Sequence, residues 1–251
     1  YGVDAGPTST GHKGQKGGRN SPTVYNAAFH MTQFWDGRAA DVEAQAGGPV
    51  LNPIEMAMSS ADDVVKKLKA IEGYPPLFAA AFDGDDPVSY DNLTKAIGAF
   101  ERRLVTPAPF DAWLAGDDAA MTEAEKKGLT VFMDAGCTAC HTGPVLGGQM
   151  YQKLGMVKAW DNPDLGRKEV TGKDADLQMF KVPSLRNIAK TGPYLHDGSI
   201  SDLSEMVHKM GEYQLGKDLS AEDVASIVAF LESLTGEIDA EYTAKPDLPA
   251  G

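Results

Sequence analysis

Residues 137–141 read CTACH: two cysteines separated by two residues, with a histidine directly after the second. Cys-x-x-Cys-His is the attachment motif of c-type haem, in which the thiols bond to the two vinyl groups and the histidine reaches the iron from the same face. A thioredoxin-like redox site would need a βαβ context, and a zinc site would need two further ligands at paired spacing. The sequence has neither pattern, so the stretch predicts covalent haem on Cys137, Cys140 and His141 and redox chemistry outside the cytoplasm.

The opposite face of the iron needs a ligand or an open position. A methionine raises the reduction potential and suits electron transfer, whereas an open position suits chemistry at the iron. Met210 lies at the end of a predicted helix, just before Gly211, and Met206 lies one turn earlier. A methionine at helical spacing is also common core filling, so position alone leaves both candidates open.

The rest of the chain reads as helices joined by long loops. Candidate N-caps precede apolar residues at helical spacing, which predicts helices after Ser60, Ser89, Thr122, Ser201 and Ser220. Thr122 and Glu125 also form a capping-box pattern. Residues 1–20 and 47–60 are expected to be irregular, and no stretch has the convincing alternation of a strand. The predicted class is all-α with long, irregular loops.

Two segments of the chain resemble each other. Residues 22–42 align without gaps on residues 183–203, at a constant offset of 161, and six of the 21 aligned positions are identical. Chance gives roughly one to two identities at ordinary residue frequencies, so the chain reads as two copies of one unit. Pro107 and Pro109 break the helical pattern between the copies. We expect one domain over 1–106 and another over 107–236, with 237–251 packing back on the first.

Composition narrows the classes of function. The 251 residues carry a formal net charge of −13, which argues against a nucleic-acid partner because nucleic acid favours a basic face. The same acidity permits a basic protein partner, or simply keeps the protein soluble. No apolar run approaches the roughly 20 residues needed to span a bilayer. The chain begins at Tyr1 rather than Met, which suggests a processed or trimmed product.

Longer stretches carry a family resemblance. The stretches are GHKGQKGGRNSPTVYNAAFHMTQFWDGRA (11–39), GGPVLNPIEMAM (47–58), CTACH, FKVPSLRNIAKTGPYLHDGS (180–199) and MGEYQLGKDLS (210–220), and the resemblance that they carry extends over nearly the whole chain in the family's order. Together they resemble bacterial di-haem cytochrome c peroxidases. The resemblance implies a periplasmic enzyme with two cytochrome c-like haem domains, and a homodimer. It also implies reduction of hydrogen peroxide to water, with electrons from a small cytochrome c or a cupredoxin.

The same resemblance assigns roles to single residues. It makes Met210 the distal ligand of the haem that accepts electrons. It makes His12 a ligand of the second, peroxidatic haem that leaves on activation. Gln45 and Glu55 match the polar pair beside the peroxide, where a glutamate could move a proton from one peroxide oxygen to the other. Trp35 matches the tryptophan between the two haems.

A calcium site between the domains is also implied by the resemblance. It consists of Asn20 with the backbone carbonyls of Thr191 and Pro193, and calcium accepts amide and carbonyl oxygens. His196, in the LHDG stretch, is a weaker candidate for a hydrogen bond near a haem propionate. His30 and His208 belong to no motif and are expected at the surface.

The sequence departs from the family pattern in one respect, because it has no second CxxCH. The repeat expects that motif upstream of Pro22, so the second of two haems would be anchored just before Tyr1. Two other functions stay open. One is an electron-transfer protein with a single His/Met haem and no peroxidase activity. The other is a relative of enzymes that oxidise tryptophans on a partner protein; these carry Tyr at the position of Met210, and Tyr213 lies close by.

Overall fold

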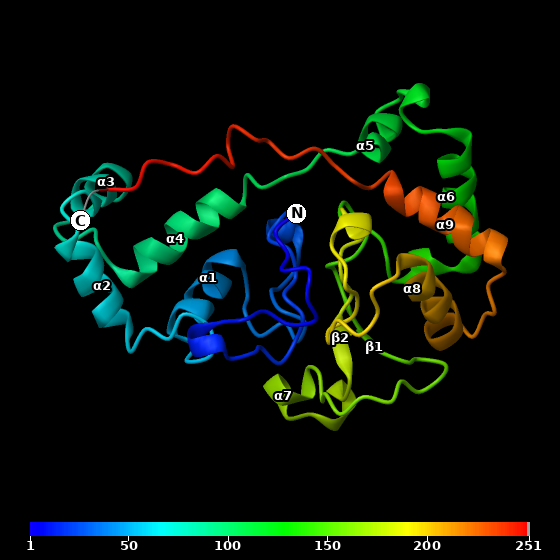
Figure 1. The fold of residues 1–251 in the computed structure, drawn as a ribbon, viewed down its shortest axis with the longest axis horizontal. Coiled ribbons are helices and arrows are strands. Elements are labelled where there is room, and N and C mark those ends of the chain that lie inside the picture. The colour runs from blue at the N-terminus through cyan, green and yellow to red at the C-terminus, as the bar shows by residue number, and fades with distance from the viewer. Residues whose placement is uncertain (250–251) are drawn as a thin grey trace.

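The computed structural model describes residues 1–249, which form two groups of helices with a loop-rich centre (Figure 1). The first group consists of α1 (Val42–Leu51), α2 (Ala61–Ala70), α3 (Tyr74–Ala81) and α4 (Tyr90–Glu101). The second consists of α5 (Pro109–Leu114), α6 (Glu123–Ala135), α8 (Leu203–Met210) and α9 (Ala221–Glu232). The centre holds the N-terminal residues, α7 (Lys168–Thr171) and the strands β1 (Tyr151–Lys153) and β2 (Met179–Lys181). The predicted class, all-α with long irregular loops, is confirmed.

Most helices begin where their capping residues predict. The side chains of Ser60, Ser89, Thr122 and Ser220 each accept the backbone N–H three residues on, at 3.1–3.3 Å. The prediction for Ser201 is wrong by one residue, because the carboxylate of Asp202 accepts the N–H of Glu205 at 2.8 Å and caps α8. A carboxylate at this position also complements the positive end of the helix.

Two expectations about irregular and strand structure need correction. Residues 47–60 are not all loop, because α1 continues through the Gly-Gly-Pro stretch to Leu51. Asp41 caps this helix, and Val42, Ala46 and Val50 bury one side of it, which outweighs the low helix propensity of glycine and proline. The strands β1 and β2 form a single antiparallel pair of three residues each, too short for alternation to be readable in the sequence.

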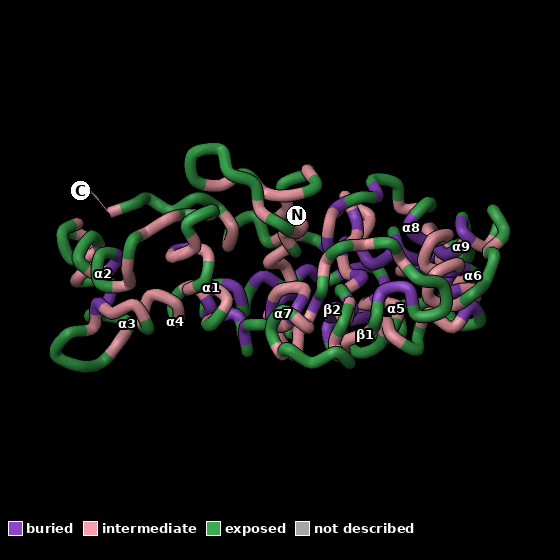
Figure 2. The backbone as a smooth tube through the Cα atoms, turned by 90° about the horizontal axis from the view of Figure 1, so that it is seen from below, coloured by how far each residue is buried: buried purple, intermediate pink, exposed green. Residues whose placement is uncertain are grey.

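The main core lies between α6 and α9. A Cβ atom on Gly128 of α6 would come within 2.0 Å of the carbonyl oxygen of Ser226 on α9, so only glycine permits this close crossing. Phe132 and Phe230 pack at the contact, with ring centroids 5.2 Å apart. Buried residues are concentrated in this group and in the centre, whereas α2 and α3 are largely exposed (Figure 2). The core therefore supports the segment that carries CTACH.

The internal repeat predicted from the sequence is confirmed by the backbone. Asn26 and Asn187, at the offset of 161, both adopt the left-handed conformation with φ of 61°. The same offset relates two short helices, Ala27–Phe29 and Ile188–Lys190, and two isolated bridges, Gln33–Ala39 and Tyr194–Ile200. The two copies therefore share a conformation as well as a sequence.

A single hydroxyl joins the two copies. The side-chain amides of Asn26 and Asn187 both donate to Oγ1 of Thr106, at 2.8 and 2.9 Å. Their carboxamide oxygens accept the backbone N–H groups of Thr106 and Gly236, at 3.2 and 2.9 Å. Thr106 is 1% exposed and Asn187 is 0% exposed, so all these bonds are shielded from water.

The copies also meet at two reciprocal backbone contacts. At the first junction, the N–H of Asn20 donates to the carbonyl of His196 at 2.7 Å. At the second junction, the N–H of Lys181 donates to the carbonyl of Trp35, also at 2.7 Å. The offset of 161 converts each contact into the other, so each copy completes the other in the same way.

The C-terminal segment returns from α9 to the first group of helices (Figure 1). Tyr242 stacks on Phe100 of α4 with centroids 4.9 Å apart, and its hydroxyl donates to the Phe100 carbonyl at 2.9 Å. The guanidinium of Arg103 lies 4.0 Å from the centroid of the Tyr242 ring. In the described part of the chain, no helix combines the length and apolar character that a membrane span requires.

Candidate functional site

The two cysteines of CTACH line a largely apolar cavity between α6, α8 and the segment 180–196. Gly136, with φ of 95°, ends α6 and turns the chain into a short 3-10 helix over Cys137–Ala139. Neither cysteine is in a disulfide, and both are half-buried. Burial raises the pKa of the Cys137 thiol to about 11. Both sulfurs therefore remain free at the cavity wall, as covalent attachment of a haem requires.

His141 completes the set on this side of the cavity. Its Nδ1 lies 3.1 Å from the carbonyl oxygen of Leu146, so Nδ1 carries the hydrogen and Nε2 is left as the free nitrogen. Burial lowers the pKa of His141, which keeps the imidazole neutral. A neutral imidazole oriented through its other nitrogen is the form that binds iron.

Both candidate methionines line the same cavity. Met206 is 8% exposed and packs with Tyr194 and Ile200 in a small core cluster, whereas Met210 lies at the edge of that cluster, at the last residue of α8. Two thiols, a neutral imidazole and a thioether around an apolar cavity fit a haem c with His and Met axial ligands. Cys137, Cys140 and His141 would hold it from one side, and a methionine of α8 from the other.

A second cavity lies beside α1 and contains the predicted polar pair. Gln45 of α1 and Glu55 line it, together with Trp35 and Glu101. A carboxylate oxygen of Glu55 accepts the side-chain amide of Asn52 at 2.8 Å, which fixes the orientation of the carboxylate. The structure therefore brings Gln45 and Glu55 to one site, although they are ten positions apart in the sequence.

His12 lies next to this second cavity. Its backbone N–H is shared between the carbonyls of Ile54 and Glu55, each at 2.8 Å. The preceding Gly11 lines the cavity, and a Cβ there would come within 2.1 Å of the Ile54 carbonyl oxygen. The imidazole of His12 is exposed and does not line the cavity. The predicted ligand histidine is thus tied by its backbone to the segment that carries Glu55.

Trp35 lies between the two cavities and lines both of them. Its indole N–H donates to the carbonyl of Asn20 at 2.9 Å, and its ring meets that of His196 edge-on, with centroids 6.3 Å apart. The repeat relates Trp35 to His196, so the two aromatic side chains meet where the copies meet. This is the placement expected for a residue between two redox groups.

The three residues of the predicted calcium site line the first cavity together. The side-chain N–H groups of Asn20 donate to the carbonyls of Gly6 and Pro7 at 3.3 and 3.2 Å, which leaves its amide oxygen free for a cation. Residues 1–249 contain no group of three or more His, Cys, Asp or Glu side chains arranged to hold a metal. An amide oxygen with the carbonyls of Thr191 and Pro193 is a different kind of site, and it suits calcium.

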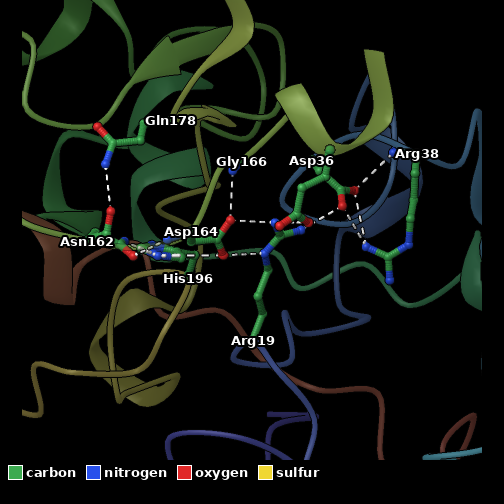
Figure 3. A network of polar contacts seen from close by, with 9 residues as sticks. Arg19, Asp36, Arg38, Asn162, Asp164, Gly166, Gln178 and His196 are labelled. Carbon is green, nitrogen blue, oxygen red and sulfur yellow. Dashed lines mark hydrogen bonds and ion pairs between the residues drawn. The ribbon is translucent and has the colours of Figure 1, made fainter. Parts of the chain in front are cut away.

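Arg19 forms a charged network with Asp36 and Asp164 that the sequence did not predict (Figure 3). Its guanidinium contacts Asp36 and Asp164, each at 2.6 Å, and Glu169 at 2.9 Å. These carboxylates raise the pKa of Arg19 above its ordinary value, and the hydrogen bond to Asp164 is the largest cause. Asp36 is in the first copy and Asp164 in the second half of the chain, so Arg19 joins the two.

His196 also belongs to this network (Figure 3). It is 2% exposed, its Nε2 contacts the side-chain amide of Asn162, and its ring stacks on Phe180 with centroids 4.3 Å apart. Burial lowers its pKa. Its side chain lines the first cavity, as a residue near a haem propionate would.

His30 and Lys181 are the further residues of the first cavity that sequence reasoning missed. The expectation that His30 lies at the surface is wrong, because its Nε2 is buried with no hydrogen-bond partner in the described chain. Its Nδ1 accepts from Nζ of Lys181 at 3.0 Å. His208 is half-exposed on α8. His30 lies within the stretch 11–39, but the resemblance assigns it no role, so the repeat offset, which pairs it with Thr191, is the signal that could have drawn attention to it.

Comparison with known proteins agrees with this geometry. Residues 1–119 match the family described as di-haem cytochrome c peroxidase, and residues 125–235 match cytochrome c. Cytochrome c551 peroxidase from Pseudomonas aeruginosa is 49% identical over 243 residues, which cover 94% of this chain and 70% of that protein. Cytochrome c551 peroxidase from Nitrosomonas europaea is 46% identical over 240 residues, which cover 94% of this chain and 71% of that protein.

A solved structure extends the comparison to three dimensions. A MauG-like protein associated with microbial copper homeostasis superposes with a TM-score of 0.84 and 28% identity, covering 96% of this chain and 81% of that one. The family implies haem c, which the donor set of the first cavity fits. The sequence matches, together with the repeat and the two cavities, establish that the chain belongs to the di-haem cytochrome c peroxidase family.

Proposed function

We propose that this protein reduces hydrogen peroxide to water with electrons from a small cytochrome c or a cupredoxin. The observation that carries the proposal is the pair of cavities that meet at Trp35, one lined by CTACH and the other by Glu55 and Gln45. A single-haem electron carrier would need only the first cavity. The second cavity, with a carboxylate and an amide directed to one place, suits acid–base work on a small polar substrate.

Within this proposal the two domains, 1–106 and 107–236, divide the work. When bound, a haem on Cys137, Cys140, His141 and Met210 would accept electrons from the donor, and a second haem in the first domain would deliver them to peroxide. Trp35 would hold the two redox groups at a fixed separation through its bond to the Asn20 carbonyl. His12 would serve as a ligand in the resting state and leave on activation, and the loop around Glu55 to which its backbone is bonded would move with it.

Glu55 and Gln45 would act on the substrate itself. The Glu55 carboxylate, oriented by Asn52, would take a proton from the proximal peroxide oxygen and return it to the distal oxygen, so that water leaves. The amide of Gln45 would orient the peroxide by hydrogen bonding. Calcium at Asn20, Thr191 and Pro193 would fix the contact between the copies. A periplasmic location, a homodimeric state and two haems per polypeptide complete the proposal.

Replacing Glu55 with Gln in the full-length, haem-loaded protein tests this assignment. The amide keeps the size of the side chain but cannot move a proton. We expect peroxide turnover to fall by a factor of about 10² to 10⁴, the usual contribution of a general base, while reduction by the donor is unchanged. Glu72→Gln, which changes an exposed carboxylate in the turn after α2, is the matched control. Unchanged turnover in Glu55→Gln, or a haem count of one in the natural full-length protein, would refute the proposal.

A further inference from the structure

Lys181 is a buried cation at the second junction. Its side chain comes from β2, is 4% exposed and lines the first cavity. Its ammonium donates to the carbonyl oxygen of Thr32 at 2.8 Å and to Nδ1 of His30 at 3.0 Å. Both acceptors belong to the first copy of the repeat, whereas Lys181 itself precedes the second copy. The ammonium therefore spans the contact between the copies.

The repeat relates this lysine to the predicted calcium site. The offset of 161 pairs Asn20 with Lys181, Thr191 with His30, and Pro193 with Thr32. The backbone contacts of Asn20 and Lys181 across the junctions are equivalent and equal in length, at 2.7 Å. At the first junction Asn20 lines one cavity together with Thr191 and Pro193, and at the second the Lys181 ammonium bonds the residues at the two paired positions. The side chain at the paired position is a neutral amide at the first junction and an ammonium at the second.

Two hydrogen-bond donors at the second junction have no acceptor within the described chain. An ammonium carries three N–H groups, and Lys181 uses two of them. Because Nδ1 of His30 accepts a hydrogen bond, the neutral ring carries its hydrogen on Nε2, which is buried and unpaired. Unpaired buried donors point to an acceptor that comes from outside the polypeptide. At the wall of a haem cavity, the acceptor whose negative charge complements the ammonium is a haem carboxylate.

We propose that Lys181 is a tethered cation, the counterpart within the chain of the metal at the first junction, and that with His30 it binds a carboxylate of the haem. It is a positioning residue, which joins the copies and places a positive charge beside the haem. The proposal rests on the haem-binding role of the first cavity. It accounts for the burial of a lysine without a carboxylate partner, which is otherwise unfavourable.

The surroundings determine how this charge responds to pH. His30 faces the ammonium from the first copy, and Tyr151 lies opposite on β1. The carboxylate whose charge acts on Lys181 is Asp36, which is already bound by Arg19 and Arg38. Burial lowers the pKa of Lys181 to about 8, and Asp36 opposes that shift. Burial, with the charge of Lys181, lowers the pKa of His30 to about 3, so His30 stays neutral throughout the working range.

The reduction potential of the haem on Cys137 and Cys140 tests the proposal in the full-length, haem-loaded protein. A positive charge favours the reduced iron, so Lys181→Met should shift the ratio of reduced to oxidised haem towards oxidised by about tenfold, equivalent to 59 mV for one electron. Lys181→Arg should retain the potential. Lys67→Met, which removes an exposed lysine of α2, is the control with the same change of charge.

The pH dependence of the potential provides a second signature. Pairing with a haem carboxylate should raise the pKa of Lys181 above the value of about 8 that its surroundings in the chain set, so the wild-type potential should fall only above pH 8, where the ammonium loses its proton, and Lys181→Met should lack this step. Equal potentials in Lys181→Met and Lys67→Met, with the step retained, would overturn the proposal.

A reciprocal substitution tests the equivalence of the two junctions. Asn20→Lys should supply a tethered cation at the first junction and make the unfolding midpoint insensitive to EGTA and to added calcium, with wild type measured in parallel. An Asn20→Lys protein as sensitive to EGTA as wild type would refute the equivalence. If EGTA does not change the unfolding midpoint of wild type, calcium binding at Asn20 is refuted as part of the proposed function. The role of Lys181 is then tested by the reduction potential of the haem alone.

Discussion

Replacing Thr106 with Val removes one buried hydroxyl and preserves the β-branched shape of the side chain. The change leaves the amide N–H groups of Asn26 and Asn187 without an acceptor. Neither amide can turn away easily, because its oxygen still accepts a backbone N–H, from Thr106 in one case and from Gly236 in the other. Each buried unsatisfied donor is unfavourable by roughly 1–3 kcal/mol. We therefore expect the free energy of unfolding to fall by about 2–6 kcal/mol.

Denaturant unfolding of the haem-loaded protein measures this loss. The transition midpoint should fall while the slope with denaturant stays constant, since the surface exposed on unfolding does not change. Thr130→Val is the control: that hydroxyl bonds the Lys126 carbonyl at 3.2 Å on the exposed face of α6. It should change the unfolding free energy by no more than about 0.5 kcal/mol. If Thr106→Val destabilises no more than Thr130→Val, the shared hydroxyl does not join the copies as described.

Three further predictions follow from the core and the cavities. Met210→Ala should abolish the spectrum of methionine ligation and lower the haem potential, and an unchanged spectrum would exclude ligation by Met210. Met206→Ala should leave the spectrum and the potential unchanged but lower the free energy of unfolding by about 2–5 kcal/mol, because it truncates a core side chain. Gly128→Ala should force α6 and α9 apart at the Ser226 carbonyl and lower the thermal midpoint by several degrees, and an unchanged midpoint would contradict the close crossing. Burial, with a lesser contribution from a neighbouring carboxylate, raises the pKa of Glu101 to about 7, so the free energy of unfolding should decline between about pH 4.5 and 7. Glu101→Gln should remove that decline and raise the free energy of unfolding by about 1–2 kcal/mol above pH 7, which urea titrations at several pH values would measure.

Local sequence signals predicted the parts of the fold that local chemistry determines. The caps at Ser60 and Thr122 need only a side-chain oxygen and the following N–H groups, so they could be read directly. Ser201 misled because two capping residues, Ser201 and Asp202, stand side by side. The helix over 42–51 was partly missed because burial of Val42 and Val50 decides it, and burial is a tertiary property.

The candidate site divides along the same line. CTACH is contiguous, and the motifs around Glu55 are distinctive, so both could be recognised from the sequence. The contacts of Arg19 with Asp164 and of Lys181 with Thr32 could not, because the partners lie 145 and 149 positions apart and no motif encodes such contacts. For Lys181 the information was present in the repeat, since the offset pairs it with Asn20, but the aligned segments began two residues too late to include that pair.

The two reciprocal junctions give this protein a property more often associated with dimers. Each half of the polypeptide carries one backbone donor and one backbone acceptor, and the partner of each lies on the other half. A chain cut in the exposed segment at Asp117 would leave two fragments, each with one unpaired backbone donor and one unpaired backbone acceptor whose partners lie on the other fragment. Such fragments should reassemble when mixed, and their association would report on the whole contact between the copies.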